Sequence, residues 1–305
     1  MHGFAAALGL SLILSAPAIA AESCPANPDA IGTSRTISVD PKMLPEIGTM
    51  QYPESLPLED HEVVITFDDG PLPPYTSRIL DILAENCVKA DYFVVGQMAK
   101  AYPDLVRRIY NSGHIVGTHS LHHPLTFNRM GEQALAAEVD GGIEAVNAAI
   151  GDPRAVAPFF RIPGLYRSRT ADDFLASRSL AVFSADEVAD DWHRGIKPKQ
   201  IVAIAMRRIE AKDHRGILLL HDIHPATVLA LPLLLKELKD NGYHIVQAVP
   251  AGDRPASVPE LSHTKTAERG SPLMAPVKNN AAGLQTRRKH TWADLAWASL
   301  GYADC

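Results

Sequence analysis

Short apolar segments alternate with longer helical patterns over residues 61–249, and this alternation constrains the fold more than any other feature. Seven segments are apolar and too short for helices: residues 63–65, 92–95, 115–116, 157–160, 180–183, 217–220 and 245–246. Five helical patterns lie between them: residues 75–86, 103–111, 131–150, 197–212 and 225–240. This alternation predicts an α/β fold in which crossover helices join parallel strands.

The number of strands limits the architecture further. About seven strands in roughly 190 residues are too few for a complete eight-stranded (β/α) barrel. A reduced or distorted barrel and an open doubly wound sheet both agree with the pattern. No internal repeat is visible.

The start of the chain has the layout of a secretory signal peptide. Residues 1–21 contain no Asp, Glu, Lys or Arg, and they end on small residues at Ala16, Ala18 and Ala20. The apolar run is too short for a stable membrane span, so we expect a signal peptide and export to the periplasm or the cell exterior. No basic residue precedes the apolar run, and a retained N-terminal apolar helix is the alternative.

The rest of the chain divides into three parts. Residues 22–60 are an N-terminal extension, and residues 61–250 carry the alternating pattern as one domain. Residues 251–305 begin with a stretch rich in Pro, Ala, Ser, Gly and charge, and we expect a flexible C-terminal tail without chemistry of its own.

Three cysteines are too few for a disulfide scaffold. Export would place the chain where disulfides persist, and domain termini often lie close together. A bridge between Cys24 and Cys305 is therefore a hypothesis, and Cys87 is expected to be a small buried apolar residue.

The charge balance excludes one class of partner. The formal net charge is −6, with 35 acidic residues against 29 basic ones, and no basic stretch dominates. This balance argues against nucleic acid as the main partner.

Polar residues follow five of the predicted strands where each strand ends. They are Thr66-Phe67-Asp68-Asp69-Gly70-Pro71, Thr118-His119-Ser120-Leu121-His122-His123-Pro124, Arg161-Ile162-Pro163-Gly164, Asp186 with Asp190-Asp191-Trp192, and His221-Asp222. Each set alone has an ordinary explanation, such as a turn, a surface ion pair or a core residue. Together they predict a site, because chemistry in α/β folds collects at the carboxyl ends of strands.

These residue types suit metal-assisted hydrolysis. Two imidazoles and one carboxylate leave positions open on a divalent metal, which lowers the pKa of water and polarises a carbonyl. Asp68 and Asp69 point in different directions, so one can bind metal while the other takes a proton from water. A nearby arginine would lower the pKa of the base, and a histidine oriented by a carboxylate would protonate the leaving group. Neither G-x-S-x-G nor G-x-x-x-x-G-K-[ST] occurs.

The same motifs resemble those of the polysaccharide deacetylases, the NodB-homology group or carbohydrate esterase family 4. The motifs are Thr66 to Pro71, the His119/His123 block, Arg161-x-Pro163, Asp191-Trp192 and Leu219-x-His221, and they occur in the family's order. The resemblance covers residues 62–249. It implies a distorted, reduced (β/α) barrel of about seven parallel strands with outer helices, which removes N-acetyl or, in some members, O-acetyl groups from glycans.

The resemblance also implies a role for each motif residue. Asp68 would be the catalytic base and Arg161 its partner. His221 would be the catalytic acid, oriented by Asp191.

The remaining motif residues would bind metal and substrate. One divalent metal, usually zinc but sometimes cobalt or another ion, would be held by Asp69, His119 and His123. The backbone amide of Gly164 would help to hold the oxyanion, and Trp192 and Leu219 would surround the acetyl methyl group.

Two departures from the family pattern concern the loops. The third motif usually continues Pro-Tyr/Phe-Gly, whereas this chain has Pro163-Gly164-Leu165-Tyr166. Before Asp191-Trp192, residues 187–190 replace a stretch that usually carries an extra Asp and Ser. Neither change touches the expected metal ligands or the acid and base.

We therefore expect an exported, monomeric, metal-dependent deacetylase of an N-acetylated oligo- or polysaccharide, such as chitin oligomers, peptidoglycan or an exported polysaccharide. An O-acetyl esterase acting on acetylated xylan-like polymers is one alternative. A catalytically silent glycan-binding module is another, and the retention of the expected acid, base and metal ligands argues against it.

Overall fold

A parallel sheet of ten strands runs through the part of the chain that the computed structural model describes, which is residue 24 and residues 27–252. The strands are β1 (Thr33–Val39), β2 (Glu46–Ile47), β3 (Glu62–Asp68), β4 (Asp91–Val94), β5 (Ile115–Thr118), β6 (Phe159–Phe160), β7 (Ala181–Phe183), β8 (Glu187–Val188), β9 (Gly216–His221) and β10 (His244–Pro250). Every pairing between these strands is parallel.

Strand β3 is the centre of the sheet. It pairs with β9 from Val63 to Asp68, and its other edge is shared by β10 and β4. The strand order is β1-β10-β3-β4-β5-β6-β7-β2, and β8 joins through β9. The carboxyl ends of the β3, β5, β6, β8 and β9 strands, which carry the polar motifs, therefore lie at one end of the sheet.

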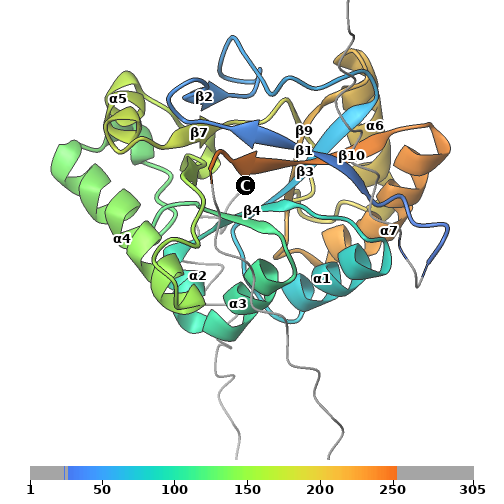
Figure 1. The fold of residues 1–305 in the computed structure, drawn as a ribbon, viewed down its shortest axis with the longest axis horizontal. Coiled ribbons are helices and arrows are strands. Elements are labelled where there is room, and N and C mark those ends of the chain that lie inside the picture. The colour runs from blue at the N-terminus through green and yellow to red at the C-terminus, as the bar shows by residue number, and fades with distance from the viewer. Residues whose placement is uncertain (1–23, 25–26, 253–305) are drawn as a thin grey trace, which may run out of the picture.

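The helices surround these strands (Figure 1). They are α1 (Tyr75–Glu85), α2 (Gly96–Ala101), α3 (Pro103–Asn111), α4 (Glu132–Ile150), α5 (Arg169–Ser177), α6 (Pro198–Ala211) and α7 (Pro225–Asp240). Proline occupies the first turn of α3, α6 and α7, where its missing N–H costs no helical hydrogen bond. Gly151 ends α4 in the left-handed region (φ 88°).

The two faces of β3 contribute to different layers of the molecule. Alternate side chains pack outward with the helices: Val63, Ile65 and Phe67. Val64 belongs instead to a second apolar cluster with Phe93, Ile217 and Val246 from the neighbouring strands. Thr66 and Asp68 share the direction of Val64, because side chains alternate along a strand. The inner face of β3 thus changes from apolar to polar toward its carboxyl end.

The expected architecture is confirmed. All seven predicted strands and all five predicted helices are present, and the fold is the distorted barrel with outer helices. The sequence analysis missed β1, β2, β8, α2 and α5. The β2 and β8 strands have two residues each, and β1 is largely exposed or half-buried, so none shows a periodic apolar pattern.

The predicted N-terminal extension contributes directly to the sheet. Strand β1 pairs with β10, and β2 pairs with β7. Residues 27–60 therefore pack as part of the barrel.

The disulfide hypothesis was wrong. Cys24 pairs with Cys87, with their Cα atoms 5.8 Å apart, so Cys87 is not an isolated apolar residue. The backbone N–H of Thr33 donates to the carbonyl of Cys87, and that of Gly32 to the carbonyl of Asn86. These bonds bring the N-terminal segment against the end of α1, and proximity of the chain ends was the wrong criterion.

Several expectations concern residues outside the described part. The predicted signal peptide, Cys305 and nearly all of the predicted tail lie there. Within residue 24 and residues 27–252, no helix is both long and apolar enough to cross a membrane.

Candidate active site

A cleft of about 540 Å³ opens at the carboxyl ends of the strands. Its lining includes seven of the ten residues expected in the site: Asp68, His119, His123, Gly164, Trp192, Leu219 and His221. The other three, Asp69, Arg161 and Asp191, are almost fully buried and contact the lining residues. The structure therefore brings all ten expected residues together.

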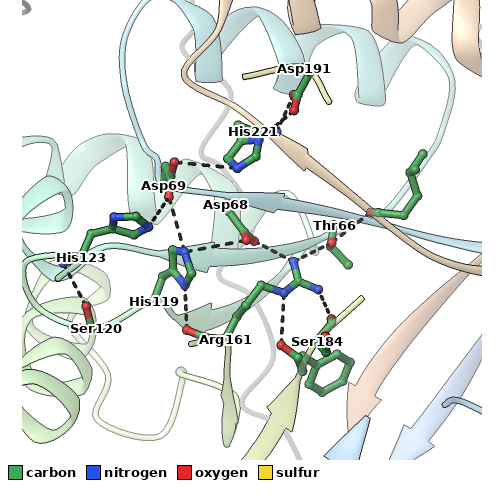
Figure 2. Close-up of polar contacts among 12 residues, drawn as sticks. Thr66, Asp68, Asp69, His119, Ser120, His123, Arg161, Ser184, Asp191 and His221 are labelled. Atoms are coloured by element: carbon green, nitrogen blue, oxygen red, sulfur yellow. Dashed lines mark hydrogen bonds and ion pairs between the residues drawn. The ribbon is translucent and has the colours of Figure 1, made fainter. Parts of the chain in front are cut away.

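Asp69 lies between the pair His119 and His123 on one side and His221 on the other (Figure 2). Its Oδ1 is 3.4 Å from Nε2 of His119 and 3.3 Å from Nε2 of His123, while its Oδ2 is 3.9 Å from Nε2 of His221. Ligand atoms of Asp69, His119 and His123 all lie within 4.8 Å of one another. These three side chains converge on one point from two strand ends.

Local backbone conformation directs these side chains. Asp68 is the last residue of β3 and points inward, while Asp69 adopts a left-handed conformation (φ 77°) that turns its carboxylate elsewhere. His123 is also left-handed (φ 58°), and its N–H donates to the hydroxyl of Ser120 at 3.0 Å. Asp and His tolerate this region better than most side chains.

The neighbouring His122 faces away from this cluster. Its ring contacts Glu138 at 2.8 Å, and its backbone N–H donates to the same carboxylate at 2.9 Å. The side chain is 58% exposed. The contacts with Glu138 thus keep His122 away from the cluster that His123 joins.

The donor atoms of the cluster fit a divalent metal. His119 Nδ1 lies 2.7 Å from the carbonyl oxygen of Arg161, which can only accept, so Nδ1 carries the proton and the Nε2 lone pair faces the cluster. Burial lowers the pKa of His119 to about 4, so this ring is neutral near pH 7. Burial raises the pKa of Asp69, but the attraction of the surrounding histidines, among them the protonated His221, outweighs burial and lowers that pKa to about 2. A neutral imidazole such as that of His119 and an ionised carboxylate such as that of Asp69 are the forms that bind metal.

Asp68 is held by a buried arginine. Arg161 Nη1 donates to Asp68 Oδ1 at 2.7 Å and to Thr66 Oγ1 at 2.8 Å, and Nη2 donates to the carbonyl of Ser184 at 2.8 Å. The guanidinium is fully buried and lies 4.1 Å from the ring centre of Phe93. A buried charge of this kind is stable only with such partners, and it fixes the direction of the Asp68 carboxylate.

His221 forms a second carboxylate–histidine pair. Its Nδ1 lies 2.7 Å from Asp191 Oδ1, and its backbone N–H donates to Asp191 Oδ2 at 2.8 Å. The hydroxyl of Thr227, in the first turn of α7, donates to Oδ2 at 2.6 Å. Burial lowers the pKa of His221, but the charge and hydrogen bond of Asp191 outweigh burial and raise it to about 9. His221 is therefore protonated near pH 7.

One part of the cleft wall is made of apolar side chains, and another part is the backbone of a turn. The Trp192 ring meets His221 edge-on, with centres 5.5 Å apart, and Leu219 lies two residues before His221 on β9. The turn at Pro163–Leu165 presents Gly164 in the left-handed region (φ 58°).

The sequence analysis assigned no role to several residues that complete the site. Thr227 orients Asp191, and Met50, Gln51 and Leu125 line the cleft. Thr227 lies only six residues after His221, the last residue of the fifth motif, so an extended motif could have included it. Met50 and Gln51 lie in a segment without any periodic signal.

Comparisons with known proteins agree with the motifs. The family model described as polysaccharide deacetylase matches residues 56–182. A peptidoglycan-N-acetylglucosamine deacetylase of Bacillus cereus is 31% identical over 183 residues, which are 59% of this chain and 66% of the relative. A chitooligosaccharide deacetylase of Sinorhizobium fredii is 33% identical over 205 residues, 62% of this chain and 90% of the relative. A solved peptidoglycan deacetylase of Bdellovibrio bacteriovorus has 30% identity and a TM-score of 0.64, covering 73% of this chain and 61% of that one.

The barrel carries the five motifs at the carboxyl ends of its strands, in the order that the resemblance predicted. The chain belongs to the polysaccharide deacetylase family, as the resemblance predicted. It spans less than two thirds of the Bacillus cereus and Bdellovibrio proteins and most of the Sinorhizobium one.

Proposed function

We propose that this chain is an exported, metal-dependent hydrolase that removes acetyl groups from N-acetylated glycans such as peptidoglycan or chitin oligomers. One observation carries the proposal. The Asp69, His119 and His123 cluster lies between a carboxylate held by arginine and a histidine held protonated by a carboxylate.

Asp69, His119 and His123 would hold the metal. When bound there, a divalent ion supplies a Lewis acid that polarises the acetyl carbonyl and lowers the pKa of water. Zinc suits this set of two nitrogens and one oxygen, and cobalt is the second candidate.

Asp68 would act as the base. It lines the cleft beside His119, with its Oδ2 3.8 Å from Nε2 of that ring, while Arg161 occupies its Oδ1. Because Arg161 holds Oδ1, it is Oδ2 that can take a proton from water as the water oxygen attacks the acetyl carbon.

His221 would act as the acid. As the bond between the carbonyl carbon and the sugar nitrogen breaks, the Nε2 proton of His221 passes to the leaving nitrogen. The overall reaction consumes one water and yields acetate and a free amino sugar. The charge of Asp191 keeps His221 protonated for this step, and Thr227 keeps Asp191 in position.

The walls of the cleft would bind the acetyl group. The backbone N–H of Gly164 would donate to the oxygen that gains negative charge, and Trp192 and Leu219 would enclose the methyl group. The left-handed turn at Gly164 supports this role, because it exposes the backbone at the cleft surface.

The substrate class and the location rest on the relatives. The Bacillus cereus and Bdellovibrio relatives are named for peptidoglycan, and the Sinorhizobium relative for chitooligosaccharides. Peptidoglycan lies outside the cytoplasmic membrane, so an exported enzyme with residues 61–250 as its catalytic domain agrees with the apolar start of the chain. The monomeric state and the role of the tail stay predictions.

Acetate release by the purified protein tests the proposal. The protein is stripped of metal with a chelator, and zinc or cobalt is then added back, with chitin oligomers and acetylated xylan as parallel substrates. We expect release from the chitin oligomers only when metal is present. Release from xylan alone would indicate an O-acetyl esterase, and glycan binding without release would indicate a silent binding module.

A further inference from the structure

Exposed apolar side chains gather at one part of the cleft rim. Among the described residues, the exposed large apolar side chains are Met43, Met50, Leu125, Tyr166, Leu229 and Leu233. Three of them, Met50, Leu125 and Tyr166, line the same cleft, with exposed fractions of 45%, 37% and 49%. Single exposed apolar residues are ordinary, whereas a group of them at a cleft marks a binding surface.

Tyr166 and Leu125 pack over the Gly164 turn. A Cβ atom at Gly164 would lie 3.0 Å from two ring carbons of Tyr166 and 3.1 Å from Cδ2 of Leu125. The third motif lacks an aromatic residue directly after Pro163, and the fold places the Tyr166 ring beside Gly164 instead.

Met50 comes from a part of the chain that precedes the family match. The family model begins at residue 56, and Met50 lies in the loop between β2 and β3. The N–H of Met50 donates to the carbonyl of Ala185 at 3.0 Å. The N–H and the hydroxyl of Thr49 both lie 2.7 Å from Asp186 Oδ1.

The next residues tie this loop to the Tyr166 side of the rim. The Gln51 amide donates to the carbonyl of Leu165, and Arg167 Nη1 donates to the Gln51 carbonyl at 3.0 Å. The Arg167 guanidinium also lies 4.5 Å from the ring centre of Tyr52. Residues 48–52 are therefore held in place by hydrogen bonds, and through Gln51 they contact the turn that follows the third motif.

Two residues of this apolar rim, Leu125 and Tyr166, follow other strands than the residues expected to hold the acetyl methyl group. Trp192 and Leu219 stand beside His221, at the β8 and β9 ends. Leu125 and Tyr166 instead follow β5 and β6, on the far side of β3 and β4 in the strand order. If the acetyl methyl group of a substrate lies against Trp192, Leu125 and Tyr166 remain available to contact another part of the glycan.

We propose that Met50, Leu125 and Tyr166 form a subsite for the sugar residue next to the one that loses its acetyl group. The inference rests on the proposed function and adds that the enzyme selects oligosaccharides over free N-acetylglucosamine. A pyranose ring has apolar C–H faces and a polar edge, so a rim of one aromatic ring and two aliphatic side chains suits it.

Selectivity between a monosaccharide and an oligosaccharide tests the subsite. The readout is the ratio of kcat/KM for the β-1,4-linked N-acetylglucosamine tetramer to that for N-acetylglucosamine. Tyr166→Ala and Met50→Ser each lower this ratio, Tyr166→Ala by about tenfold, mainly through a higher KM for the tetramer. Tyr166→Phe keeps the ring and most of the ratio. Met43→Ser is the matched control, because Met43 lies in the same N-terminal segment, is 80% exposed and does not line the cleft.

The outcomes separate the subsite from the proposed function. Absence of acetate release by the metal-loaded wild type would reject the proposed function, and the Kd of the tetramer, measured by calorimetry, then decides on the subsite. Weaker tetramer binding by Tyr166→Ala than by wild type supports the subsite in that case. An unchanged ratio, an unchanged Kd, or no tetramer binding by the wild type would overturn it.

Discussion

His119 and His221 are both buried in one cleft, yet their acid–base properties are opposite. The pKa of His119 is about 4 and that of His221 about 9. Each ring has its Nε2 within 4 Å of an Asp69 oxygen, so this shared neighbour does not explain the difference. Their Nδ1 atoms do: His119 faces the neutral carbonyl of Arg161, and His221 faces the carboxylate of Asp191.

The comparison shows how one residue type can have opposite protonation states in one site. A carbonyl partner leaves burial as the dominant influence, and the ring stays neutral with its lone pair available to a metal. A carboxylate partner outweighs burial, and the ring keeps a proton that it can donate. The predictions below remove one side of this contrast at a time.

Replacing His119 should have the largest effect. His119→Ala removes a neutral nitrogen ligand, so we expect the chain to lose most of its bound metal and acetate release to fall by more than about 10⁴-fold. Metal content by mass spectrometry and acetate release together check this. An active His119→Ala protein with full metal content would contradict the ligand assignment.

Replacing Asp68, the proposed base, should abolish most turnover while leaving the bound metal in place. Asp68→Asn keeps the shape of the side chain and the Arg161 contact at one oxygen, but the amide cannot accept the proton of water. We expect kcat to fall about 10³-fold with metal content unchanged. Near-normal kcat would show that another group is the base.

Removing the carboxylate partner should make His221 behave more like His119. In the wild type, activity should be lost as pH rises through about 9, because His221 then loses the proton that it donates. In Asp191→Asn the pKa of His221 falls toward its ordinary value of ~6.5, so this loss should occur at lower pH, and kcat at pH 8 should fall by up to about 30-fold. A pH profile of kcat measures both effects, and an unmoved alkaline limb would argue against His221 as the acid.

Weakening the same pair should produce a smaller version of that change. Thr227→Val removes one hydrogen bond to Asp191 and preserves the volume of the side chain. We expect kcat to fall by no more than about fivefold, with a shift of the alkaline limb in the same direction. A loss of kcat without any shift would mean that Thr227 acts only on packing.

His122 should matter least, although it is adjacent to a proposed ligand. Its ring is exposed and contacts Glu138, away from the cluster. We expect His122→Ala to retain kcat within about twofold and full metal content, since an exposed pair contributes little. This variant is the matched control for His119→Ala, and loss of metal from it would mean that the ligand set is different.

Much of the fold and of the proposed catalytic centre could be predicted from local sequence. Each strand core is a short apolar run, and parallel strands bring their carboxyl ends to one edge, so Asp68, His119 and His221 had to lie near one another. The motif spacing predicted that His123, and not His122, belongs to the cluster with Asp69 and His119. The contact between His122 and Glu138, which holds His122 away from that cluster, could not be predicted from the motif.

The remaining features depend on contacts between distant segments. Met50 reaches the cleft because its backbone bonds to Ala185, and Cys24 reaches Cys87 because residues 32 and 33 bond to the end of α1. No local pattern encodes such pairings, since short irregular segments carry neither helical nor strand periodicity. The cysteine pairing in particular could not be deduced from spacing.

The Cys24–Cys87 bond has a consequence for how the protein is prepared. It joins residues 63 positions apart, and closing a loop of that length stabilises a folded chain by about 4 kcal/mol in the chain-entropy description. It also fastens the start of the segment that continues into β1, β2 and the Met50 loop. Material folded in a reducing host would therefore keep the Asp69, His119 and His123 cluster but melt earlier, with the Met50 loop less firmly held. The proposed selectivity for oligosaccharides would then depend on the redox history of the sample.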